Sequence, residues 1–108
     1  MSQKYIAVTE ILMDLEKELR QLNLWDFELP SAEALASTEP FAVDTLNFPQ
    51  WLQFIFIPRL YFMVKHCSAL PTNCAVTAMA EEYFQALNAN TARVISHLQK
   101  MDSLLSEQ

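Results

Sequence analysis

The chain contains no glycine in its 108 residues, and this absence constrains the fold more than any other feature of the sequence. Tight hairpin turns place residues at positive φ, which glycine adopts most easily, so a hairpin-rich β protein is disfavoured. Helices tolerate the absence, because asparagine can occupy the left-handed position that ends a helix. Leu, Ala, Glu, Gln and Met are abundant and favour helices. The sequence therefore predicts an all-α fold in a single domain covering residues 1–108.

The spacing of apolar residues predicts a helical bundle of about four helices plus a short helix. In the first helix, Tyr5, Val8 and Leu12 begin a stripe with alternating steps of three and four residues. We expect helices over residues 3–24, 32–37, 47–66, 77–87 and 91–106. One long bent helix over residues 77–106 is an alternative, because the apolar register continues across the "NANT" segment.

The segment between the first and third predicted helices is rich in proline but is not a solvated tether. Ser31 is expected to cap the short helix, with Glu33 in its first turn. Six apolar side chains are too many for an exposed linker, so we expect the segment to pack across the bundle and bury them: Trp25, Phe27, Phe41, Val43, Leu46 and Phe48.

The helix predicted over residues 47–66 is apolar around its whole circumference, which is typical of a helix at the centre of a domain. Its apolar run is about 21 Å long, too short for a bilayer core of about 30 Å, and Arg59 within it would cost at least ~2.5 kcal/mol in lipid. Asn47 and Gln50 have the spacing of a capping box. Pro58 lies in the helix interior, so we predict a kink around Phe56 and Ile57.

Arg59 is the one charged residue in this apolar run. If it is buried, it needs an acidic partner, and Asp44, just ahead of the helix, is the candidate. In the alternative interpretation, Arg59 lies beside carbonyl groups freed by Pro58 and binds an anionic ligand or a partner.

The charge balance excludes several classes of partner. There are 13 acidic and 7 basic side chains, for a net charge of −6, and residues 21–58 contain no Lys or Arg. We therefore expect no direct binding to nucleic acid, which requires cationic side chains, and no contact with an acidic membrane. The first residues lack the apolar core of a signal peptide, and two cysteines do not indicate a disulfide scaffold, which together predict a cytoplasmic protein.

No catalytic or cofactor-binding pattern emerges from the sequence. His66, Cys67 and Cys74 are too few for a tetrahedral zinc site, and the other histidine, His97, is distant along the chain. A glycine-rich phosphate loop is excluded because glycine is absent. We therefore expect no catalytic residues, no cofactor and no metal.

The segment "STEPFAVDTLNFPQWLQFIFIPRL", residues 37–60, resembles the signature of the YqcC-like family of small bacterial proteins, and residues 70–84 resemble a later block of that family. The resemblance covers nearly the whole chain and implies a helical bundle over residues 1–108. It also implies an association with a tRNA pseudouridine synthase encoded nearby, tRNA pseudouridine synthase C. Such enzymes use a catalytic aspartate on a mixed α/β fold, so the resemblance does not imply synthase activity here.

Two functional hypotheses follow from these observations. In the first, the chain is a non-catalytic cytoplasmic partner or helper of a tRNA pseudouridine synthase. In the alternative, the bundle binds a small molecule near Trp51 and Arg59, over a floor that includes Phe54 and Tyr61. The resemblance carries over the motif residues Phe41, Asp44, Thr45, Trp51, Leu52, Ile57, Pro58 and Arg59. The candidates for binding among them are Phe41, Asp44, Thr45, Trp51, Pro58 and Arg59.

Overall fold

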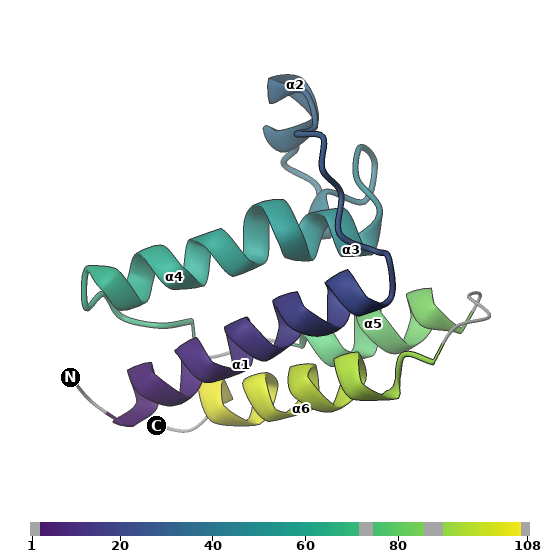
Figure 1. Ribbon diagram of the computed structural model, residues 1–108. Coiled ribbons are helices and arrows are strands. Elements are labelled where there is room, and N and C mark those ends of the chain that lie inside the picture. Colours follow the sequence, from purple (N-terminus) through teal and green to yellow (C-terminus); the bar gives the residue numbers. More distant parts are fainter. Residues whose placement is uncertain (1–2, 72–74, 86–89, 107–108) are drawn as a thin grey trace.

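A computed structural model of the chain describes residues 3–71, 75–85 and 90–106, and every regular element within them is helical. The all-α prediction is therefore confirmed (Figure 1). In chain order the elements are α1 (Gln3–Gln21), α2 (Ala32–Leu35), the 3₁₀ turn η1 (Pro40–Ala42), α3 (Phe48–Trp51), the π-helical segment η2 (Leu52–Phe56), α4 (Ile57–Lys65), α5 (Val76–Phe84) and α6 (Ala92–Ser106). None of the described helices is both long and apolar enough to cross a membrane.

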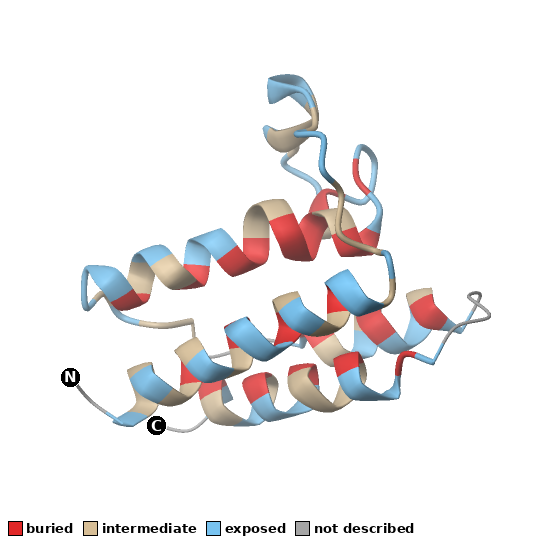
Figure 2. Ribbon diagram, viewed as in Figure 1, coloured by how far each residue is buried: buried red, intermediate tan, exposed pale blue. Residues whose placement is uncertain are grey.

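Helix α1, rather than the apolar helix after it, lies in the middle of the bundle. It packs against α6 on one side and α4 on the other, while α5 packs against α6 (Figure 1). The predicted stripe of α1 is fully buried at Val8, Leu12, Leu15 and Leu19. The apolar circumference of the helix predicted over residues 47–66 favours a central position, but α4 is buried on one face only: Ile57, Leu60 and Val64 are buried, while the outer face is exposed (Figure 2) and Phe62 there is 62% exposed.

The local signals for helix ends are confirmed. The Ser31 hydroxyl accepts a hydrogen bond from the Ala34 N–H and caps α2. Asn47 and Gln50 form both bonds of the capping box at the start of α3, at 2.9 and 3.0 Å. Helix α1 ends slightly earlier than predicted, and Asn23 closes it at φ 60°. The Leu24 N–H donates to the Leu19 carbonyl across this left-handed residue, as in a Schellman motif.

Helices α5 and α6 are separate, so the alternative of one long helix is wrong. Helix α5 ends at Phe84, α6 begins at Ala92, and the two pack side by side. Residues 86–89, which include most of the "NANT" segment, lie outside the described residues.

The disturbance predicted around Pro58 takes the form of a π-helical segment. Elements α3, η2 and α4 form one helical run from Phe48 to Lys65, and the Ile57 N–H bonds the carbonyl of Leu52, five residues earlier. Proline has no N–H, and its ring clashes with the carbonyl four residues before it in an ideal α-helix. The wider π-turn moves the preceding carbonyls away from the ring, so the helix continues through Pro58.

The segment between α1 and α3 projects beyond the bundle, with α2 at its outer end (Figure 1). Its apolar residues are only partly buried. Leu46 and Phe48 enter the core, and Trp25 and Phe41 pack against it. The prediction that the segment buries all six is wrong for Phe27 and Val43, which are exposed, because the segment folds back on its own short turns instead of crossing the bundle.

Candidate functional site

Three of the six candidate residues gather around the π-helical segment η2, which joins α3 to α4. Phe41 comes from η1, Trp51 ends α3, and Arg59 lies in the first turn of α4. The rings of Phe41 and Trp51 meet edge to face, with their centroids 4.7 Å apart. Such a pair contributes about 0.5–1.5 kcal/mol beyond the area that it buries. We call this cluster of Phe41, Trp51 and Arg59 the motif groove, because the three residues line two adjoining hollows.

One hollow is small and mainly apolar. Its volume is about 260 Å³, and its lining beyond the three motif residues includes Phe56, Leu60, Met63 and Val76. The other hollow is larger, about 540 Å³, and more polar, because η1 and the residues before it contribute Ser37, Thr38 and Glu39. An apolar floor beside a guanidinium group suits a ligand that has both a hydrophobic part and a negative charge.

The backbone around Phe41 is strained. Phe41 and Ala42 both adopt left-handed conformations, at φ 57° and φ 49°, which cost roughly 1–2 kcal/mol for residues with a Cβ atom. The Ala42 N–H bonds the Glu39 carbonyl, and the Leu46 N–H bonds the Ala42 carbonyl, so local hydrogen bonds maintain this geometry. The turn places the Phe41 ring against Trp51 and Phe48. Strain of this kind is concentrated at functional sites.

The predicted buried pair of Arg59 and Asp44 is wrong. Both residues are exposed, and the Asp44 carboxylate instead accepts a hydrogen bond from the Ser37 hydroxyl at 2.5 Å. Asp44 therefore has a hydrogen-bond partner within the projecting segment itself, seven residues earlier in the chain. Among the described residues, no ion pair involves Arg59. Its guanidinium is therefore available to a ligand at the edge of the motif groove.

The remaining candidates lie outside the motif groove. The Thr45 hydroxyl donates to the Ala34 carbonyl at 2.8 Å and ties α2 to the turn before α3. Asp44 stabilises the same turn through Ser37. Pro58 is exposed on α4 and lines neither hollow. In this structure these three residues shape the projecting segment and the helix.

The sequence did not predict a second exposed surface, which is formed by residues that follow α1 in the chain. The buried side chain of Gln53, on the π-helical segment, accepts from the Asp26 N–H at 2.8 Å and donates to the Asp26 carbonyl at 2.7 Å. Just after this anchor, Phe27 is 87% exposed and Leu29 is 74% exposed. We call residues 26–29 the acidic turn, since Asp26 and Glu28 flank the exposed ring. The available signal was Gln53, a polar residue in an otherwise apolar run.

Hydrogen bonds in and beside the acidic turn stabilise the ionised form of Asp26. The Glu28 N–H and, to a lesser extent, the Gln50 side chain donate to its carboxylate, and these bonds hold the pKa of Asp26 below its ordinary value. Trp25, Pro49 and Tyr83 line a hollow of about 440 Å³ beside the turn.

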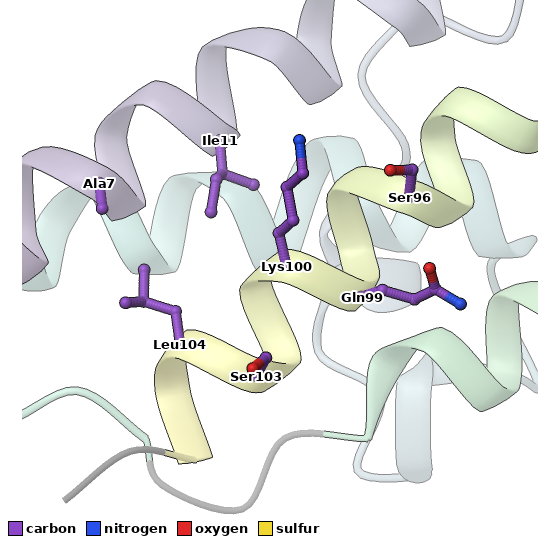
Figure 3. Close-up of a pocket in the computed structure, with 7 residues that line it drawn as sticks. All are labelled: Ala7, Ile11, Ser96, Gln99, Lys100, Ser103 and Leu104. Carbon is purple, nitrogen blue, oxygen red and sulfur yellow. The ribbon is translucent and has the colours of Figure 1, made fainter.

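A further hollow of about 530 Å³ lies between α1 and α6. Figure 3 shows its lining side chains, with Ala7 and Ile11 from α1 and Ser96, Lys100 and Leu104 from α6. These are side chains on the flanks of two packed helices, and Lys100 is the charged group among the described residues of this lining. The hollow follows from the way the two helices pack and carries none of the candidate residues.

The sequence predicts no metal site at His66, Cys67 and Cys74, and Cys74 lies outside the described residues. Within the described part of the chain, no three His, Cys, Asp or Glu side chains gather closely enough to hold a metal ion.

Comparison with known proteins places these features in context. Residues 7–104 match the family DUF446, which is described as tRNA pseudouridine synthase C. An uncharacterized protein of Haemophilus influenzae is 42% identical over 77 residues, which cover 71% of this chain and 73% of that protein. The solution NMR structure of protein YqcC from E. coli has a TM-score of 0.86 at 28% identity and covers 98% of this chain and 91% of that chain.

A different kind of relative is a protein of Pectobacterium carotovorum named tRNA pseudouridine synthase C. It is 41% identical over 64 residues, which cover 59% of this chain but 17% of that protein. Most of that longer protein therefore lies outside the similarity.

Proposed function

Because this chain belongs to the family described as tRNA pseudouridine synthase C, we propose that it is a non-catalytic helical protein that binds a tRNA pseudouridine synthase as its partner. The observation that carries the proposal is the similarity to the Pectobacterium protein of that name, where the matched segment forms 17% of the chain. Contacts between domains of one chain resemble the contacts between separate proteins. A segment found within one synthase is therefore a reasonable partner for another.

The charge of the chain supports a protein partner of this kind. A net charge of −6 disfavours direct contact with tRNA, whose phosphates require Lys and Arg. An enzyme that binds tRNA is positively charged where it contacts the phosphates, and this charge is opposite to that of the chain. Complementary charge speeds association and improves specificity.

The direct test is a titration of the purified chain with the purified tRNA pseudouridine synthase of the same organism. We expect saturable heat in calorimetry and co-elution in size-exclusion chromatography. The chain alone, incubated with unmodified tRNA, should produce no pseudouridine. Separate elution with no heat at the highest concentrations that both proteins tolerate would overturn the partnership, and pseudouridine formed by the chain alone would overturn the non-catalytic role.

A second candidate function is the binding of a small apolar carboxylate in the motif groove. It is favoured by the exposed guanidinium of Arg59 beside an apolar hollow of about 260 Å³, close to the lower limit of about 300 Å³ for ligand pockets. A Trp25→Phe variant would leave Trp51 as the fluorescent reporter, and benzoate is a suitable probe.

In that background, benzoate should change the Trp51 fluorescence to saturation, and Arg59→Ala should weaken the response at least ~10-fold, as expected for loss of a charged anchor. Arg20→Ala, which removes another exposed arginine, is the matched control. Because Arg59 is exposed, its substitution should alter stability by no more than about 0.5 kcal/mol. Equal responses from the parent and from Arg59→Ala would exclude the role of Arg59.

A further inference from the structure

We propose that the acidic turn, with Phe27 and Leu29 at its surface, is the contact by which this chain docks onto a basic protein surface that has an apolar pocket. The inference rests on the proposed function and deepens it, since it names the face of the chain that meets the synthase. It assigns the interaction to residues outside the motif groove.

The acidic turn exposes two large apolar side chains. Phe27 is 87% exposed and Leu29 is 74% exposed, and a hollow partly lined by Trp25 and Tyr83 adjoins Phe27. Single exposed apolar residues are common, but neighbouring ones rimmed by polar groups are typical of interaction sites. Phenylalanine and tryptophan are also enriched in the buried centres of interfaces.

The acidic turn is held in place by hydrogen bonds before any partner binds. Gln53 bonds both the N–H and the carbonyl of Asp26, at 2.8 and 2.7 Å, and Gln50 donates to the Asp26 carboxylate at 3.3 Å. The Glu28 N–H bonds the same carboxylate at 3.0 Å. Ordering a loop on binding reduces affinity, so a preorganised turn presents Phe27 at a lower entropic cost.

The charge around the acidic turn selects the chemistry of the partner. Residues 21–58 contain no Lys or Arg, while Asp26, Glu28 and Glu33 lie in or just after the turn. Asp26 is ionised at neutral pH, since its ordinary pKa is 3.8 and the Glu28 and Gln50 hydrogen bonds lower it further. The nearest cation along the chain, Arg20, is paired with Glu16 at 3.1 Å and lies over the Trp25 ring. A basic surface complements this face, whereas an acidic membrane or a nucleic acid does not.

The test is calorimetric titration of the synthase with Phe27→Ser and with Phe62→Ser as the matched control. Phe62 is also strongly exposed, at 62%, but it lies on the outer face of α4. Phe27→Ser should weaken binding at least ~10-fold, as expected for an aromatic anchor at an interface centre, while Phe62→Ser should bind like the parent. Both variants should melt like the parent, because neither ring is buried.

A third variant separates the charge from the ring. Glu28→Lys should slow association and reduce the dependence of the association rate on salt, because it reverses a charge that steers the partner. If the parent binds the synthase and Phe27→Ser and Glu28→Lys bind equally well, the docking surface is wrong and the partnership stands. If the parent does not bind, both are overturned.

Discussion

Asp102 caps the N-terminus of a helix other than the one on which it lies. It lies on α6, but its carboxylate accepts from the N–H groups of Val76 and Thr77, at 3.2 and 2.8 Å, and from the Thr77 hydroxyl at 2.6 Å. Ala75, at the N-cap position of α5, offers no side-chain acceptor. The first N–H groups of a helix have no partner within it, and a negative charge there also interacts favourably with the helix dipole. Asp102 therefore fixes α5 against α6.

Asp102→Ala should lower the free energy of unfolding by about 0.5–2 kcal/mol, the range found for loss of an N-cap acceptor. The melting temperature should fall by several degrees, which thermal circular dichroism measures directly. Asp102→Asn, which keeps an acceptor oxygen but loses the charge, should recover part of the loss. Glu82→Ala, which removes an exposed carboxylate from α5 itself, is the matched control and should change little. Equal melting temperatures for Asp102→Ala and Glu82→Ala would contradict the capping role.

The lowered pKa of Asp26 makes the stability of the fold depend on pH in the acid range. Its pKa is below the ordinary value of 3.8, first because of the Glu28 N–H and then because of Gln50. A carboxyl group with a lowered pKa in the fold contributes stability above its unfolded pKa and loses it as the pH falls through the folded value. Asp26→Asn should therefore melt below the parent at neutral pH, and the gap should close as the pH falls below 3.8. A gap that stays constant down to the acid transition would show that ionisation of Asp26 contributes nothing.

At the scale of the elements, helices α1 and α4 end at left-handed residues that are not glycine. Asn23 follows α1 at φ 60°, and Cys67 follows α4 at φ 51°. In both places an N–H bonds a carbonyl five residues earlier, from Leu24 to Leu19 and from Ser68 to Met63. Asparagine tolerates this conformation better than cysteine does. The end of α4 is therefore the more strained of the two.

Cys67→Gly should stabilise the protein by roughly 1 kcal/mol, because glycine removes the cost of the Cβ atom at positive φ. For a domain of this size, that gain raises the melting temperature by roughly 4–8 °C. Asn23→Gly should gain less, and Cys67→Ser should gain nothing, since it removes the thiol without relieving the backbone. Thermal melts of the three variants test the ranking. A Cys67→Gly variant that melts no higher than Cys67→Ser would show that the left-handed backbone stores no strain.

The sequence predicts well those features that depend on residues close together in the chain. Asn47 and Gln50 are three residues apart and form the capping box that their spacing indicates. The failures involve choices between distant partners. Asp44 bonds Ser37 instead of Arg59, and Gln53 bonds Asp26 across 27 residues, because each depends on where the projecting segment settles. The left-handed backbone of Phe41 was also beyond prediction, since bulky residues rarely adopt it.

For the molecule as a whole, the acidic excess is the dominant electrostatic feature. Arg20 forms an ion pair with Glu16 and Arg93 forms one with Glu18, and both arginines are exposed. Exposed pairs contribute only about 0–1 kcal/mol. The net charge of the chain, by contrast, is −6. Residues 21–58 contain carboxylates but no Lys or Arg. Self-repulsion among like charges destabilises a compact state, so repulsion should outweigh the pairs.

Added salt should therefore raise the melting temperature at neutral pH. Increasing NaCl from about 0.01 to about 0.15 M shortens the screening length from about 30 to about 8 Å, which weakens the long-range repulsion more than the close pairs. Glu39→Gln, which removes one negative charge from the projecting segment, should flatten this dependence, and Gln85→Glu, which adds one on an exposed position after α5, should steepen it. Differential scanning calorimetry across the salt range measures all three slopes. A melting temperature that falls with salt would mean that attractive pairs outweigh the repulsion.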